Sequence, residues 1–228
     1  LNKNNNFPNK KKIIRYLVDE NISKANLNEA CQNITLINKD VKDSYLNQFK
    51  IICFIKNNKK NEAQLVLDLL REQKLSNKFF DNKIDYLLGL TDKLDTKIND
   101  TNLLNFYLSS ITIPNFTYMP NKQTNKKIWQ YLIAANLFKV NDTENKEQIK
   151  EFEIAANSNA LLKTYIFEIY KNLKFNFNDF LNIDEIYPTL DPISARALVY
   201  QKVLLSDNIE TKLKYLFLLN NLFEEDKL

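Results

Sequence analysis

The sequence predicts an all-α fold, an irregular α-solenoid or helical-hairpin array of about 11–12 short helices. One glycine and five prolines in 228 residues leave little material for the tight turns of β-hairpins or for a glycine-rich nucleotide loop. Apolar residues also recur at helical spacing in segment after segment, with short polar runs between them. A hydrophobic content of 44% excludes a mainly disordered chain.

The sequence of the first half of the chain predicts a flexible leader followed by six helices. Residues 1–10 are polar, which indicates a flexible leader, and residues 11–228 form a single helical-repeat domain with a subdivision allowed near 112–123. Ser76 and Thr101 stand where they could cap the fifth and sixth helices, and Gly89 falls near the end of the fifth. The six predicted helices are 11–20, 27–37, 44–57, 60–74, 77–91 and 102–111.

Five further helices are predicted in the second half of the chain. Asp191 and Pro192 make a strong helix start, because a capping carboxylate precedes a proline at the first helical position. Two stretches that contain proline, 113–120 and 174–190, interrupt the helical pattern and are expected to be non-helical connections. The five helices are 124–140, 143–156, 160–173, 193–206 and 209–223.

Both interruptions are rich in large apolar side chains, for which two interpretations exist. They could be loops that offer aromatic anchors to a partner, or loops that fold back over a core. The second is favoured for 113–120, since exposed aromatic clusters are uncommon on monomers. The candidate partner-binding residues are Phe116, Tyr118, Met119, Phe175, Phe177 and Tyr187.

The two cysteines predict a covalent link between the second and third helices. Cys31 and Cys53 are equidistant from Lys42 in the predicted turn, so their sulfurs would face each other in an antiparallel pair. A disulfide would close a loop of about 23 residues and stabilise the fold by roughly 3 kcal/mol. The alternative is a pair of buried free thiols. We favour the disulfide, which implies an oxidising compartment.

The charged residues indicate structural roles. The net charge of +4 is modest and forms no basic stripe, so no nucleic-acid partner is expected. Lysine outnumbers arginine 29 to 3, the bias of an AT-rich genome, which suggests that each arginine stands where a planar guanidinium is needed. Apolar residues nearly surround Arg196 on its predicted helix, so we expect a structural ion pair with Asp191 or Asp184.

No recognisable catalytic, cofactor-binding or metal-binding set is present in the sequence. The absence of histidine excludes histidine-based triads and the usual zinc sites. The cysteine spacing matches no redox or zinc motif. Paired carboxylates such as Glu151 with Glu153 indicate solvated charge better than acid–base catalysis. We therefore expect no enzyme activity, no metal and no cofactor.

The segment 54–70 is similar to the middle of a tetratricopeptide repeat. Phe54 is followed by a polar turn, by Ala63 nine residues later, and then by Leu67 and Leu70. The resemblance covers about half a repeat, and no second copy follows at the 34-residue period of that family. It implies helical hairpins that pack closely at the small alanine.

More broadly, the two cysteines and the segments 63–71 and 195–201 resemble uncharacterised exported helical proteins of alphaproteobacteria. That resemblance implies a periplasmic or envelope-associated location, after removal of a signal peptide or anchor upstream of Leu1. No apolar run is long enough for a transmembrane segment. The predicted function is a non-catalytic scaffold that binds a protein or peptide; the alternative is a helical accessory domain of a cell-wall enzyme such as a lytic transglycosylase.

Overall fold

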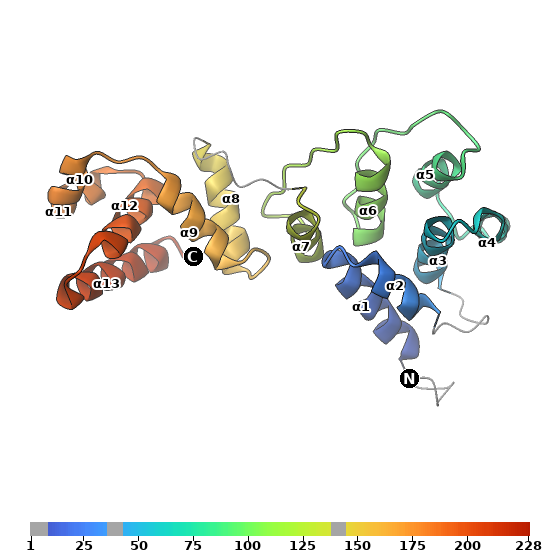
Figure 1. Cartoon of the computed structure of the whole chain (residues 1–228), viewed down its shortest axis with the longest axis horizontal. Helices are drawn as coiled ribbons and strands as arrows, with labels where there is room; N and C mark the ends of the chain where they lie inside the picture. The colour runs from blue at the N-terminus through green and yellow to red at the C-terminus, as the bar shows by residue number, and fades with distance from the viewer. Residues whose placement is uncertain (1–8, 36–42, 138–144) are drawn as a thin grey trace. The chain divides into compact units, whose positions relative to one another are not determined.

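The computed structural model describes residues 9–35, 43–137 and 145–228, and within them it contains thirteen α-helices, one 3-10 helix (η1) and no strand (Figure 1). The predicted all-α class is confirmed, with helices that pair into hairpins. The chain divides into two compact units: unit 1 comprises Leu1–Tyr118 and Lys127–Leu137, and unit 2 comprises Met119–Lys126 and Phe138–Leu228. One boundary, after Tyr118, falls in the stretch 112–123 where the sequence allowed a subdivision.

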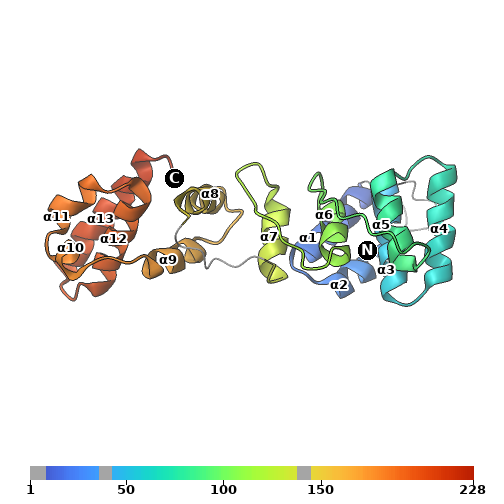
Figure 2. The same cartoon turned by 90° about the horizontal axis from the view of Figure 1, so that it is seen from above.

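Unit 1 packs its helices mainly against their neighbours in the sequence. The helix α1 packs on α2, α3 on α4 and α5 on α6, and α1 also contacts α6. Figure 2 shows α3, α4 and α5 side by side. The bounds are α1 Lys10–Ser23, α2 Leu27–Ile34, α3 Ser44–Lys56, α4 Lys60–Glu72, α5 Lys78–Leu88, α6 Leu103–Thr112 and α7 Lys126–Ala134.

The predicted cysteine pair is confirmed at disulfide distance. The sulfur atoms of Cys31 and Cys53 lie 2.08 Å apart and join α2 to α3. These two helices touch, but each has its larger contact with another helix, α2 with α1 and α3 with α4. The disulfide therefore links two hairpins. Lys42 and most of the predicted turn lie outside the described residues, as do residues 1–8 of the leader.

Asparagine side chains cap helices where other residues were expected to do so. Asn77, not Ser76, accepts a backbone N–H at the start of α5, and Asn102, not Thr101, does the same for α6. The expected caps stand one position too early, because a cap must accept from the N–H two or three residues later. Gly89 ends α5 as predicted, in the left-handed conformation with φ 77°.

Unit 2 contains a continuous stack of four longer helices, α8, α9, α12 and α13. The helix α9 packs on α8 and α12, and α12 also packs along α13 (Figure 2). The expected helix start at Asp191 is confirmed, since its carboxylate accepts the N–H of Ser194 at 3.1 Å. The bounds are α8 Lys146–Asn157, α9 Lys163–Asn172, α10 Phe177–Leu181, α11 Ile183–Ile186, η1 Tyr187–Thr189, α12 Pro192–Leu205 and α13 Ile209–Glu225.

The stretch 174–190 is partly helical, contrary to the predicted non-helical connection. It forms α10, α11 and η1. The start of α10 carries a capping box, in which Asn176 and Asp179 each accept a backbone N–H of the other. Most of the large apolar residues of the stretch belong to or pack on a core cluster shared with α12 and α13: Phe175, Phe180, Ile183, Ile186, Tyr187 and Leu190.

No helix in the described part of the chain has the length and apolar character that a bilayer crossing requires. The end of the predicted helix 124–140 lies outside the described residues, and the helix predicted at 143–156 begins at Lys146.

Candidate functional site

A buried ionic network lies at the centre of unit 2, where α8, α9, α12 and α13 meet. Arg196 on α12 donates to both carboxylate oxygens of Glu153 on α8, with Nε to Oε1 at 3.2 Å and Nη2 to Oε2 at 2.7 Å. The two side chains are only 2% and 1% exposed. Nη1 donates to the carbonyl oxygen of Leu222 at 3.4 Å and to Asp226. This set of hydrogen bonds requires arginine, because the ammonium group of lysine cannot reproduce the planar arrangement of donors on a guanidinium.

These contacts correct the expected partner of Arg196. Asp191 accepts a backbone N–H at the start of α12 and binds Lys146. Asp184 binds Lys214 at 2.6 Å. Arg196 lies more than one turn beyond the start of α12, so its side chain meets α8 rather than the cap. The predicted structural ion pair exists, but with Glu153 and Asp226 in place of Asp191.

Tyr170 on α9 completes the network. Its hydroxyl donates to Glu153 and accepts from Arg196 Nε at 3.2 Å. Burial raises the pKa of Tyr170, and the neighbouring Glu153 charge raises it further. Burial lowers the pKa of Arg196, but Glu153, Tyr170 and Asp226 together outweigh this effect and raise the pKa above its usual value, so the guanidinium stays cationic. Glu153, which the sequence placed in solvent beside Glu151, is therefore a buried structural anion.

The network fixes the aromatic ring of Phe223 on α13. The ring centroid lies 5.4 Å from Arg196 Cζ, and the ring stacks on Tyr170 at 6.3 Å between centroids. Gln201 on α12 adds two hydrogen bonds to the C-terminal carbonyls of α9, at 2.6 Å to Tyr170 and 2.7 Å to Leu173. Four helices are thus tied together around one arginine, which makes a rigid frame for the surface beside it.

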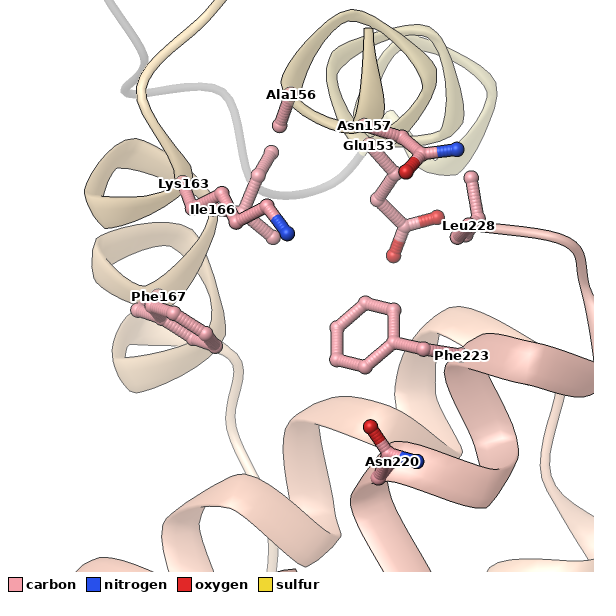
Figure 3. A pocket seen from close by; sticks show the side chains of 9 residues that line it. All are labelled: Glu153, Ala156, Asn157, Lys163, Ile166, Phe167, Asn220, Phe223 and Leu228. Atoms are coloured by element: carbon pink, nitrogen blue, oxygen red, sulfur yellow. The ribbon is translucent and has the colours of Figure 1, made fainter. Parts of the chain in front are cut away.

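A cavity of about 190 Å³ opens beside this frame, between α8, α9 and α13 (Figure 3). Its apolar wall includes Phe167 and Phe223, and the ammonium of Lys163 extends toward its centre. Glu153 also borders it, but Arg196 already engages both oxygens of that carboxylate. No described residue forms an ion pair or hydrogen bond with the Lys163 ammonium. The cavity therefore offers an apolar wall and one ammonium group that has no ionic partner among the described residues. The full lining is Glu153, Ala156, Asn157, Lys163, Ile166, Phe167, Asn220, Phe223 and Leu228.

A second cavity, of about 340 Å³, lies on the α12 side of Glu153. Charges of both signs line it, and some are already paired, as Lys146 is with Asp191. A lining that neutralises itself in this way gives no preference for a charged ligand. The first cavity is therefore the better candidate site. The charged lining of the second consists of Lys146, Glu147, Lys150, Glu153, Asp191, Arg196 and Asp226.

An apolar stripe on α13 leads into the first cavity. Ile209, Leu213, Leu216 and Phe217 recur at helical spacing, which places them on one face, and all four are exposed. Ile209 and Phe217 are 73% and 69% exposed. Asn220 follows Leu216 by four residues on the same face and lines the cavity. The opposite side of α13 packs inward through Tyr215 and Leu219, so this helix is apolar on two faces.

The predicted partner-binding residues of 113–120 do not form a common site. Phe116 and Tyr118 pack edge-on against Phe106 of α6, at centroid distances of 5.5 and 4.8 Å. The hydroxyl of Tyr118 donates to Asp100 at 2.6 Å. Both rings therefore cover unit 1, the structural alternative that the sequence favoured. Met119 belongs to unit 2 and is exposed.

The predicted residues of 174–190 divide in the same way. Phe175 and Tyr187 pack against the core cluster that α12 and α13 share. Phe177 is 75% exposed. None of the three lines the cavity beside Lys163. Their role in partner binding therefore stays a prediction. The aromatic residues that line the cavity are Phe167 and Phe223.

Sequence reasoning missed Lys163, Phe167 and Phe223 as cavity residues. The visible signal was α13 itself: apolar residues at 209, 213, 216 and 217 repeat every three to four positions beside a second apolar series at 215, 219 and 222. A helix with two apolar faces needs two partners. Comparison with known proteins gives no relative from which to transfer a role: no protein-family model, no curated protein and no solved structure matches this chain.

Proposed function

We propose that the chain is a helical scaffold that binds a partner protein through unit 2, and that it works in an oxidising compartment such as the bacterial periplasm. The observation that carries this proposal is the uncovered apolar stripe on α13. Monomeric proteins rarely expose a contiguous stripe of large apolar residues, so Ile209, Leu213, Leu216 and Phe217 mark an interaction surface.

The occupant that this stripe fits is an amphipathic helix of the partner. Its length, from Ile209 to Asn220, is about 17 Å at 1.5 Å per residue, which equals about three turns of a partner helix. Lys212 lies four residues before Leu216 and eleven before Phe223, so the three share one edge of α13. Lys212 and Lys163 are both without a described ionic partner. Charge complementarity therefore calls for acidic residues along the matching edge of the partner helix.

The compartment is inferred from the cysteine pair. Cys31 and Cys53 lie at disulfide distance, and disulfides persist in secreted and periplasmic proteins but are rare in the cytosol. Quantifying thiols in unreduced protein from its native source tests this part of the proposal, and two free thiols would contradict it.

Selection of peptides from a random library on immobilised protein tests the binding function. We expect enriched peptides with apolar residues at i, i+3 or i+4, and i+7, and with acidic residues beside them. Their binding should be lost in the double variant L216K/F217K, because two ammonium groups would then interrupt the apolar stripe. The matched control is Leu65→Lys, which places a lysine at a leucine of α4 that is 63% exposed. Peptides that bind L216K/F217K as well as the native protein would refute the proposal.

A further inference from the structure

We infer that the cavity beside Lys163 is a subsite for the C-terminal residue of the partner chain: a large apolar, preferably aromatic, side chain together with its free α-carboxylate. This inference rests on the proposed function and names the chemistry of the anchor. Covering the exposed apolar area of the α13 stripe stabilises a complex. Most of that gain is offset by the translational and rotational freedom that the two molecules lose on association. Specific binding therefore needs an anchor in addition to the stripe.

The cavity supplies both halves of such an anchor within the space of one residue. Phe167 on α9 and Phe223 on α13 provide aromatic walls, with Ile166 and Ala156 beside them. The ammonium of Lys163 extends into the same 190 Å³ (Figure 3). A large apolar side chain and a carboxylate occur on one residue only at the C-terminus of a chain. An internal aspartate or glutamate carries the charge but not a large apolar group, which a second residue would have to supply.

Lys163 and two amide groups can hold an anion in the cavity. Arg196 engages both oxygens of the Glu153 carboxylate, and the pair is almost completely buried, so Lys163 at the start of α9 has no ionic partner among the described residues. The amides of Asn157 and Asn220 also line the cavity, and each uses its nitrogen in only one described hydrogen bond. Each therefore has a second N–H to donate to a carboxylate.

Continuity with the stripe identifies the occupant as a chain end rather than a free small molecule. Leu216 and Phe217 precede Asn220 by four and three residues, and Asn220 precedes Phe223 by three. The face of α13 that carries the stripe thus continues past the polar Asn220 to Phe223 in the cavity. A helix that lies on the stripe would end with its C-terminal residue at Lys163, where the negative end of its own dipole also meets positive charge.

The test compares three probes by nuclear magnetic resonance titration of the full chain. N-acetyl-phenylalanine carries the carboxylate on the aromatic residue, N-acetyl-phenylalaninamide lacks the charge, and N-acetyl-glutamyl-phenylalaninamide carries it on a neighbouring side chain. We expect the acid to bind about tenfold more tightly than the amide, as for a hydrogen-bonded charge. The shifted resonances should be those of the cavity lining. The dipeptide amide should bind no better than the simple amide.

Variants separate the subsite from the rest of the surface. Lys163→Met should remove the preference for the acid, and Asn220→Trp should weaken both probes by filling the mouth; both positions are exposed, so the fold should tolerate the changes. The control Lys150→Met removes an equally unpaired lysine at the other cavity and should leave the preference unchanged. Equal affinity for acid and amide, or equal affinity for the acid and the dipeptide amide, would overturn the subsite. Neither result would affect the peptide selection that tests the stripe.

Discussion

Replacing Arg196 with methionine should strongly destabilise unit 2. Methionine keeps most of the side-chain length and removes the charge and all donors. Glu153 would then remain buried with only the hydroxyl of Tyr170 as a hydrogen-bond donor, and Asp226 would lose its partner. Breaking a buried ion pair from one side costs about 3–5 kcal/mol, because an uncompensated charge is left in a medium of low polarity.

The chain contains a matched control for this substitution. Arg71 in unit 1 also pairs with carboxylates, at 2.8 Å to Asp85, 3.5 Å to Asp81 and 3.9 Å to Asp68, but its side chain is 33% exposed. Water can solvate Asp81 and Asp85 once Arg71 is gone, so Arg71→Met should cost about 1 kcal/mol or less. The same chemical change at two depths therefore isolates the effect of burial.

Urea unfolding followed by circular dichroism gives the free energies, and hydrogen exchange with mass spectrometry assigns the loss to α8, α9 and α12. The double variant E153L/R196M should recover most of the stability that either single change removes, because replacing both partners leaves no buried charge. Fluorescence of Trp129, the single tryptophan, reports unit 1 separately. If Arg196→Met costs no more than Arg71→Met, or if the double variant is as unstable as the sum of the two single changes, the argument for a central buried ion pair is wrong.

Three further predictions concern the fold. Reducing the Cys31–Cys53 pair should lower the free energy of unfolding by about 3 kcal/mol for a separation of 22 residues, and the C31S/C53S variant should not respond to reductant. Burial raises the pKa of Tyr45, Tyr107 and Tyr170 above the value of about 10 that tyrosine has in the unfolded chain. Their contribution to the free energy of unfolding is therefore complete below about pH 10 and declines as the pH rises further. A spectrophotometric titration in which every tyrosine of the folded protein ionises near pH 10 would contradict this. Asn102→Ala should cost about 1 kcal/mol and Asn102→Ser almost nothing, measured by thermal unfolding, because only the alanine lacks an oxygen for the N–H of Asn105.

The helical architecture could be predicted because its signals are local. Periodicity identifies each amphipathic helix, and Asp191 with Pro192 defines the start of α12 within one turn of chain. The cysteine pairing could be predicted because Cys31 and Cys53 are equidistant in sequence from Lys42 and lie on consecutive helices. The short helices α10 and α11 were missed because five and four residues are too few for periodicity to appear. Asn176 and Asp179, which form the capping box of α10, were the remaining local signal.

The candidate site could not be predicted because its residues come from distant segments. Glu153 and Arg196 are 43 residues apart, and no local pattern indicates which of 28 acidic residues will face the guanidinium. Proximity in sequence favoured Asp191, but that carboxylate already serves the N-terminus of α12. Lys163 looks like any surface lysine until the fold places Phe167 and Phe223 beside it.

Asparagine shows how a composition bias acquires a structural role. The abundance of asparagine is typical of proteins from AT-rich genomes, and its clusters carry no motif. Yet asparagine accepts backbone N–H groups at helix starts such as Asn77 and Asn208, and it takes the left-handed conformation after helices at Asn58, Asn136 and Asn159. These are the positions that serine or aspartate and glycine usually fill. A chain with one glycine can therefore still end its helices, because asparagine tolerates positive φ better than other non-glycine residues.

The three arginines provide the complementary case, in which a rare residue marks the need for its geometry. Arg15 lies over the ring of Tyr45, with Cζ 4.1 Å from the centroid, and Arg71 donates to both oxygens of Asp85 at 2.9 and 2.8 Å. Arg196 combines both modes, a two-point bond to Glu153 and a contact with the Phe223 ring. A lysine ammonium can act as a point charge but cannot present a flat fork and a stacking face together. Phe223 is also a wall of the cavity. The contact between Arg196 and the Phe223 ring therefore positions one wall of the proposed subsite.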